Sequence, residues 1–151
     1  MKLITFLISI LFLAGVSTSS LAANIHTNST PGVQGYDLVS YHSETGPIRG
    51  NGHYVSDHEG VTYLFSTKEN MQAFNKNPQN YIPAYGGYCA YGVSVGKKFV
   101  GDPTVWKIVD GKLYLNLDEN IQKEWEKDIP GRIAMADKEW PKIKDASPAS
   151  L

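Results

Sequence analysis

The sequence contains a single cysteine, Cys89, among its 151 residues. An internal disulfide is therefore excluded, and so is a structural zinc site of four cysteines. Neither sign of charge is in excess, because 14 lysines and arginines stand against 15 aspartates and glutamates. This balance lacks the basic character that nucleic-acid binding requires, so we expect no nucleic acid among the partners. Tyrosine and glycine are abundant instead, with nine and 14 residues.

Long apolar runs are absent except at the N-terminus. Lys2 precedes the mostly apolar residues 3–14, and small residues continue to Ala23. A positive start, a short apolar stretch and a small-x-small end are typical of a cleaved secretory signal, which we predict over residues 1–22. The run is short for a retained membrane anchor, which is the alternative. We therefore expect an exported, periplasmic protein with no transmembrane segment after cleavage.

Three segments follow the predicted signal. Residues 23–32 are polar and rich in turn formers, so we expect a loose lead-in. Residues 33–143 hold all the periodic segments and are predicted to form one domain that ends in helices. Residues 144–151 lack periodicity and are predicted to form a flexible tail. No internal repeat is evident along the chain.

The first half of the predicted domain reads as a strand, a hairpin and a helix. Residues 35–42 are predicted to form an extended entry strand. Residues 53–58 and 61–65 flank a Glu-Gly pair, which predicts a hairpin. Directly after it, Ser66 opens a capping-box pattern, in which a hydroxyl accepts free backbone amides of a helix. The helix is predicted to stop before Pro78.

The second half carries a second hairpin and two more helices. Residues 106–109 and 112–117 flank an Asp-Gly pair, the strongest hairpin signal in the chain. Asp118 is predicted to cap a second helix, and Pro130 to begin a third that Pro141 ends. Strands and helices are grouped locally, so the fold class is α+β. We expect a small antiparallel sheet of two hairpins with about three helices in a single compact domain.

Several motifs resemble the YHS-domain family. Residues 41–43 spell the Tyr-His-Ser triplet of the family's name. Residues 60–66 and 77–81 resemble the family's hairpin and its Asn-Pro-x-x-Tyr ending after the helix. A Gly-Gly-Tyr-Cys-Ala-Tyr-Gly segment at residues 86–92 is similar to one in a longer, exported subgroup, and this likeness extends over residues 35–140. The resemblance implies a non-enzymatic accessory protein.

The family resemblance also implies a metal site. In its metal-linked members two cysteines lie four residues apart, so that two thiolates on one helix face meet a soft ion. Here those positions align with Ser66 and Asn70, and neither is a soft ligand. We therefore expect no copper or zinc site of the family's type at these two residues.

The other soft-metal donors are the thiol of Cys89 and four histidines. His26 lies in the predicted lead-in, and His53 and His58 lie five residues apart on one predicted strand, on opposite faces. His42 with Cys89, or with His53, is therefore the candidate for copper or zinc. The alternatives are a buried, inert thiol at Cys89 and a histidine hydrogen-bonded to backbone at position 42.

Tyr85, Tyr88 and Tyr91 surround the cysteine in a glycine-rich segment that fits neither helix nor long strand. They either pack in the core or form an aromatic wall for a ligand or partner peptide.

These patterns leave three functional hypotheses. The first is an exported, non-enzymatic accessory protein that binds or senses copper or zinc through His42 and Cys89. The second is a metal-free module that binds a protein or small ligand through the Gly/Tyr/Cys segment. The third is a thiol-dependent enzyme, which would need a base oriented by a third group. No cysteine-hydrolase signature surrounds Cys89, so we assign no catalytic residue.

Overall fold

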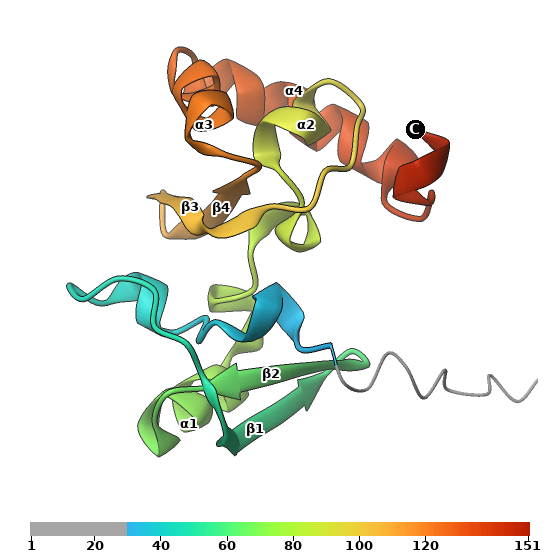
Figure 1. The fold of residues 1–151 in the computed structure, drawn as a ribbon. Coiled ribbons are helices and arrows are strands. Elements are labelled where there is room, and N and C mark those ends of the chain that lie inside the picture. Colours follow the sequence, from blue (N-terminus) through green and yellow to red (C-terminus); the bar gives the residue numbers. More distant parts are fainter. Residues whose placement is uncertain (1–29) are drawn as a thin grey trace, which may run out of the picture.

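The first half of the chain builds a hairpin followed by a helix (Figure 1), within a computed structural model that describes residues 30–151. β1 (Asn51–His58) pairs antiparallel with β2 (Val61–Phe65), and α1 (Lys68–Lys76) follows. Glu59 and Gly60 form the turn with positive φ at both positions. This backbone matches the right-handed twist of a two-residue hairpin. The hairpin and the helix predicted here are confirmed.

The second half contains another hairpin and the remaining helices. Its elements are α2 (Ala90–Ser94), β3 (Asp102–Val109), β4 (Lys112–Asn116), α3 (Glu119–Glu126) and α4 (Ile129–Ile143). The predicted α+β class is confirmed, and both predicted hairpins are present. They form two separate two-stranded sheets. The described residues contain four α-helices, and the additional one is the short α2 in the glycine-rich segment.

The two halves repeat one arrangement of elements. Each opens with a 3₁₀ turn, Gly32–Gly35 or Ala84–Gly87. The tyrosine after each turn, Tyr36 or Tyr88, forms an isolated antiparallel bridge to a residue just before the next hairpin. The hairpins also match in register, because each has one irregularity near the start of its first strand. The expectation of no internal repeat is therefore wrong: residues 31–36 and 83–88 share Pro-x-x-x-Gly-Tyr, and both hairpin turns pair an acidic residue with glycine, although most other side chains differ.

β4 lies between two hydrophobic clusters and joins the halves. Leu113 and Leu115 pack on one side with Phe74 and other residues of the first half. Tyr114 packs in the other cluster with Trp125, at 5.6 Å between ring centroids. Successive side chains of a strand point to opposite faces, so β4 serves one cluster with each face. β4 therefore contributes side chains to the hydrophobic clusters of both halves.

The entry strand predicted over residues 35–42 is wrong. Tyr36 forms one bridge, and the chain then turns into a 3₁₀ helix at Ser40–His42. The cause is Asp37, whose carboxylate accepts hydrogen bonds from the amides of Val39 (2.9 Å) and Ser40 (3.3 Å). An aspartate that bonds to the backbone two and three residues ahead favours a turn over a strand.

The predicted cap of α1 is displaced by one residue. Thr67 is the N-cap, and its hydroxyl accepts from the amide of Asn70 at 3.1 Å. Ser66 is not the cap, because its hydroxyl donates to Asp37 at 2.6 Å. The Ser66 hydroxyl, which the capping-box pattern assigned to the end of the helix, is thus bound to Asp37 instead.

Pro141 does not end the last helix, as the sequence predicts, because α4 continues to Ile143. Ile143 is buried in the second cluster, and the carbonyls of Lys144 and Ala146 accept from the ammonium group of Lys98 at 3.0 and 2.7 Å. Burial and these hydrogen bonds offset the loss of one amide donor at proline.

The predicted signal over residues 1–22 lies outside the described residues, and so does most of the predicted lead-in, 23–32. At the other end a 3₁₀ turn spans Pro148–Ser150, and Leu151 packs against the second cluster. Within residues 30–151, no helix is both long and apolar enough to cross a membrane.

Candidate functional site

Two strained turns meet at the junction of the halves. In the first, Val33 and Gln34 have φ angles of 49° and 52°, and in the second, Tyr85 and Gly86 have φ angles of 55° and 62°. Left-handed backbone is costly for residues other than glycine, and most of all for a β-branched valine. Such strain persists only where the surrounding structure imposes it, and it is concentrated at binding and active sites.

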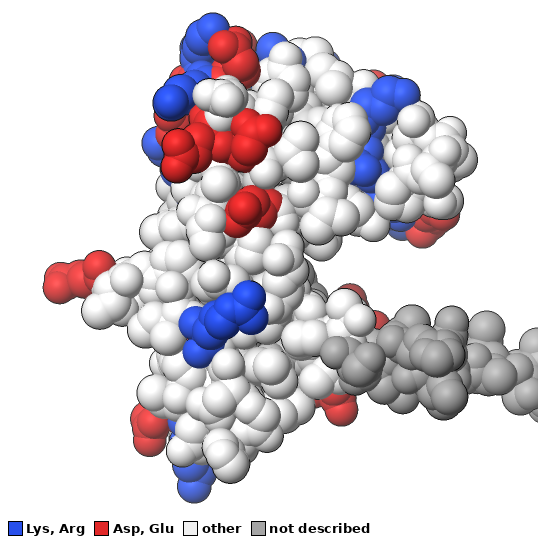
Figure 2. Space-filling model, viewed as in Figure 1, with Lys and Arg blue, Asp and Glu red and all other residues white. Residues whose placement is uncertain are grey.

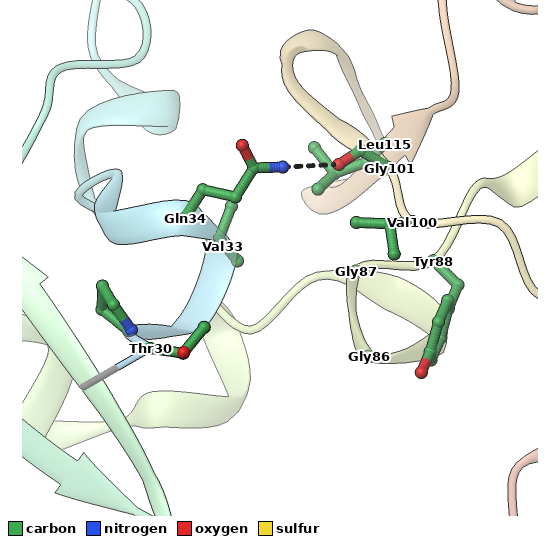
Figure 3. Close-up of a pocket in the computed structure, with 10 residues that line it drawn as sticks. Thr30, Val33, Gln34, Gly86, Gly87, Tyr88, Val100, Gly101 and Leu115 are labelled. Atoms are coloured by element: carbon green, nitrogen blue, oxygen red, sulfur yellow. Dashed lines mark hydrogen bonds between the residues drawn. The ribbon is translucent and has the colours of Figure 1, made fainter. Parts of the chain in front are cut away.

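A pocket of about 250 Å³ opens between these turns (Figure 3). Val33, Val100 and Leu115 supply aliphatic walls, and Tyr88 supplies an aromatic one. Thr30 and Gln34 supply polar side chains, and Nε2 of Gln34 donates to the carbonyl oxygen of Gly101 at 3.4 Å. The lining thus comes from both halves of the chain. We call this cavity the junction pocket.

Two glycines keep the backbone of the junction pocket close to its neighbours. A Cβ added to Gly101 would lie 2.6 Å from the carbonyl oxygen of Gly87 and 2.7 Å from the Cβ of Leu115. Real side chains do not tolerate such contacts, so only glycine fits at position 101. Gly87 itself has a φ of 82°, which glycine adopts at little cost.

Tyr88 is held in place from behind by a buried lysine. The ammonium nitrogen of Lys98 lies 4.6 Å from the Tyr88 ring centroid and 5.8 Å from that of Trp140. Lys98 is only 8% exposed, and its remaining hydrogen bonds go to the two carbonyls after α4. A cation over a ring face is attracted by the ring's quadrupole. The aromatic wall of the junction pocket is therefore pre-positioned.

The other two predicted tyrosines have different surroundings. Tyr85 is buried, and its hydroxyl donates to Asp137 at 2.9 Å. Burial, reinforced by that carboxylate, raises the pKa of Tyr85. The ring of Tyr91 lies under the guanidinium of Arg132, at 4.3 Å from its centroid. Of the three, Tyr88 contributes to the junction pocket, whereas Tyr85 and Tyr91 anchor the segment to α4.

The surface charge is unevenly distributed. Figure 2 shows charged side chains gathered over α3, where Lys107 pairs with Glu126 and Lys127 with Glu124. Around the notch between the two halves, at the right of the same view, most of the visible atoms belong to uncharged residues. The described residues that line the junction pocket include no charged side chain, so a ligand there is selected by shape and apolar contact more than by charge.

Ser66 and Asn70, where the family's metal-linked members carry cysteines, converge on Asp37. The carboxylate accepts from the Ser66 amide (2.8 Å), the Ser66 hydroxyl (2.6 Å) and the Asn70 side-chain amide (2.7 Å). Asp37 is fully buried. Its amide donors from Val39 and Ser40 complete five hydrogen bonds to one carboxylate. A hydrogen-bonded polar cluster thus occupies the place where the resemblance implies a metal site.

Cys89 occupies the position in the second half that Asp37 occupies in the first. Its sulfur caps α2 by accepting from the Gly92 amide at 3.4 Å, and the Tyr91 amide donates to the side-chain oxygen of Asn116 at 3.4 Å. The thiol donates to the side-chain oxygen of Asn116 at 3.7 Å. Both Cys89 and Asn116 are fully buried. Burial raises the pKa of Cys89, and the backbone amides oppose that shift only in part.

The predicted metal-binding residues lie in different parts of the molecule. His42 is exposed at the end of a 3₁₀ helix, with its ring edge against Tyr81 at 5.4 Å between centroids. His53 is exposed at the bulge of β1, whereas Cys89 is enclosed in the second half. Among residues 30–151, no group of three or more His, Cys, Asp or Glu side chains is placed to hold a metal ion. The copper or zinc site stays a prediction.

Burial and the raised pKa predict a slow thiol. We expect iodoacetamide to alkylate Cys89 in the folded protein roughly a hundredfold more slowly than in urea. The thiol must first be exposed by local unfolding, and a free energy of about 3 kcal/mol for that step accounts for the slower rate. The rate is also expected to keep rising with pH after that of the unfolded control has levelled off, because the folded thiol ionises at higher pH. Mass spectrometry measures both rates on the single cysteine. Equal rates in the two states would contradict burial.

Sequence reasoning found Tyr88 but missed the opposite wall of the junction pocket. Val33 and Gln34 lie next to the predicted lead-in and carry no chemical motif. The Pro-Gly at residues 31–32 is the local signal of a turn, and it resembles the Pro-Ala at residues 83–84 before the second turn. Only pairing these two segments would have drawn attention to the junction.

Comparison with known proteins does not extend this description, because no family model, curated protein or solved structure matches the chain. The resemblance to the YHS-domain family therefore stays a prediction from the motifs at residues 41–43, 60–66 and 77–81.

Proposed function

We propose that this chain is an exported, non-enzymatic binding protein of the YHS type that takes a small apolar molecule in the junction pocket. The observation that carries the proposal is the convergence of two strained turns, one from each half, on a single pocket of about 250 Å³. The rest of the fold maintains this strain at a cost in stability. A pre-formed binding site offsets that cost, because the ligand binds without reordering the chain.

The lining indicates the chemical class of the ligand. Aliphatic walls and one aromatic ring favour an apolar body, and Gln34 offers a single amide that can both donate and accept. A dry apolar cavity of about 150 Å³ is enough to bind benzene. The larger junction pocket therefore suits one fused ring system or a branched aliphatic group with one polar atom.

The thiol of Cys89 has a structural role, and the same sulfur cannot serve it while acting in catalysis or binding a metal. Cys89 caps α2 and donates to Asn116, and it is enclosed on all sides. The junction pocket does not include it among its lining residues. This arrangement supports the metal-free binding module over the metal-handling protein and over the thiol-dependent enzyme.

A direct test uses indole as the probe and the mature chain, residues 23–151. We expect saturable binding with a Kd of about 1 mM, equivalent to about −4 kcal/mol. Val100→Asp is expected to weaken it roughly tenfold, or about 1.4 kcal/mol, because a carboxylate at the rim of an apolar pocket must lose water when the ligand enters. Val100 is 64% exposed, so its substitution should leave folding intact. Heteronuclear NMR titration measures the affinity and locates the site.

Val55→Asp is the matched control, since Val55 is also an exposed valine, on β1 and away from the pocket. It is expected to bind indole as the unmodified chain does. Shift changes that avoid Val33, Tyr88 and Leu115 would overturn the proposal. A parallel titration with zinc and copper(I), repeated on Cys89→Ser and His42→Ala, tests the competing hypothesis. Stoichiometric binding lost in both variants would favour the metal site.

A further inference from the structure

A second cleft, with polar lining, lies where the first half meets the turn of the second hairpin. It has a volume of about 530 Å³, within the range of about 300–1,000 Å³ typical of small-molecule sites. Its functional side chains are His42, Gln79, Asn80, Tyr81, Asp110 and Lys112. It shares no lining residue with the junction pocket. We call it the polar cleft.

The polar side chains of this cleft have no hydrogen-bond or ion-pair partner among residues 30–151. Gln79 and Asn80 make no side-chain hydrogen bond to any residue that the structure describes, and the same holds for His42 and the hydroxyl of Tyr81. Asp110 and Lys112 form no ion pair with each other or with another described residue. Six side chains without a hydrogen-bond or ion-pair partner among residues 30–151 therefore line one cleft.

The floor of the polar cleft is aromatic and anchored. Tyr81 packs against the fully buried Phe74, at 6.4 Å between ring centroids, and belongs to the first hydrophobic cluster. The imidazole of His42 stands edge-on to the Tyr81 ring. Partial desolvation of the imidazole lowers the pKa of His42, which favours the neutral ring with one donor and one acceptor nitrogen.

The charges in the polar cleft balance. One carboxylate and one ammonium group flank the turn of the second hairpin, at Asp110 and Lys112. No net charge attracts an anion or a cation, whereas planar amides and a carboxylate can bond two neighbouring hydroxyls at once. An aromatic ring face also packs well against the C–H groups of a sugar ring.

We propose that the polar cleft is a binding site for a neutral polyhydroxyl ligand of mono- or disaccharide size. Gln79 and Asn80 bond its hydroxyls from one side, Asp110 and Lys112 from the other, and Tyr81 contacts its ring face. This inference is independent of the function proposed for the junction pocket, because the two sites differ in position and in chemistry.

The test is a titration of the full mature chain with maltose, followed by NMR. We expect millimolar affinity, with shift changes at His42, Asn80 and Lys112. Gln79→Ala is expected to weaken binding roughly five- to tenfold, the equivalent of one hydrogen bond of about 1 kcal/mol. Gln72→Ala is the matched control, because Gln72 is an exposed glutamine on α1 that does not line the cleft. The affinity of the Gln72→Ala variant for maltose should equal that of the unmodified chain.

Three outcomes would overturn the proposal. The first is the absence of saturable shift changes with maltose and with glucose, and the second is equal weakening by Gln79→Ala and Gln72→Ala. The third is a preference for the zwitterion glycylglycine or for zinc over both sugars, since either would show that charge or metal coordination governs the cleft. Indole binding, measured on the same samples, reports on the junction pocket alone and keeps the two proposals distinguishable.

Discussion

Replacement of Asp37 by alanine is expected to lower the free energy of unfolding by about 3–5 kcal/mol, a large fraction of the stability of a domain of this size. The buried carboxylate accepts five hydrogen bonds, from Val39, Ser40, Ser66 and Asn70. Alanine would leave these buried donors without their acceptor, at about 1–3 kcal/mol for each one that finds no other partner. Urea unfolding followed by circular dichroism measures the change.

The repeat supplies the control. Cys89→Ala removes the group that occupies the same position in the second half, but the thiol makes weaker hydrogen bonds than a carboxylate does. We expect a loss of about 1–2 kcal/mol there, from a small cavity and one lost cap. A loss below about 1 kcal/mol for Asp37→Ala would mean that its donors find other partners, and it would contradict this account of the cluster.

The second large effect is expected in the hydrophobic clusters on the two sides of β4. Phe74→Ala and Trp125→Ala should each lower the free energy of unfolding by about 3–5 kcal/mol, the usual cost of deleting a buried aromatic ring. Each substitution is also expected to destabilise both halves, because Leu113 and Leu115 belong to the cluster around Phe74 while Tyr114 packs against Trp125. A single cooperative transition should therefore persist in both variants.

Two probes test this cooperativity. Fluorescence follows the tryptophans, all of which lie in the second half, and amide exchange of β1 and β2 follows the first. Coincident transitions are the expected result. If β1 and β2 kept their protection in Trp125→Ala after the tryptophan signal had unfolded, the halves would be independent and β4 would not couple them.

The elements that sequence reasoning predicted well depend on neighbours in the chain. Asp110-Gly111 forms the predicted turn, and Asp118 caps α3 through the amide of Ile121 at 2.9 Å. Turn geometry and helix capping involve groups within three or four residues, so the sequence carries them directly. The hairpins and their helices were accessible for this reason.

The errors arose where a distant residue overrides a local signal. The local pattern predicts Ser66 as a helix cap, but its hydroxyl donates to Asp37, which lies 29 residues earlier. Pro141 is typical of a helix end, but α4 continues beyond it because Lys98, which precedes β3, donates hydrogen bonds to the backbone carbonyls after the helix. Neither partner is identifiable from spacing, because each contact depends on how the halves pack.

The candidate site shows the same division. The Gly/Tyr segment was singled out by its composition, and Tyr88 does line the junction pocket. The opposing wall at Val33 and Gln34 was missed, since aliphatic and amide side chains beside a predicted lead-in carry no chemical signature. The repeat that relates the two turns was missed because only the Pro-x-x-x-Gly-Tyr pattern of residues 31–36 and 83–88 marks it in the sequence, whereas the shared backbone conformation shows it directly.

The sequence by itself determined the α+β class, both hairpin turns and the exclusion of disulfides and of a four-cysteine metal site. Tertiary structure decided that Cys89 is enclosed, that β4 is buried on both faces and that two strained turns meet in one pocket. The hydrogen bond across that pocket joins Gln34 to Gly101 over a separation of 67 residues. Local patterns encode turns, caps and periodicity, whereas a site made from two halves exists only after they have packed together.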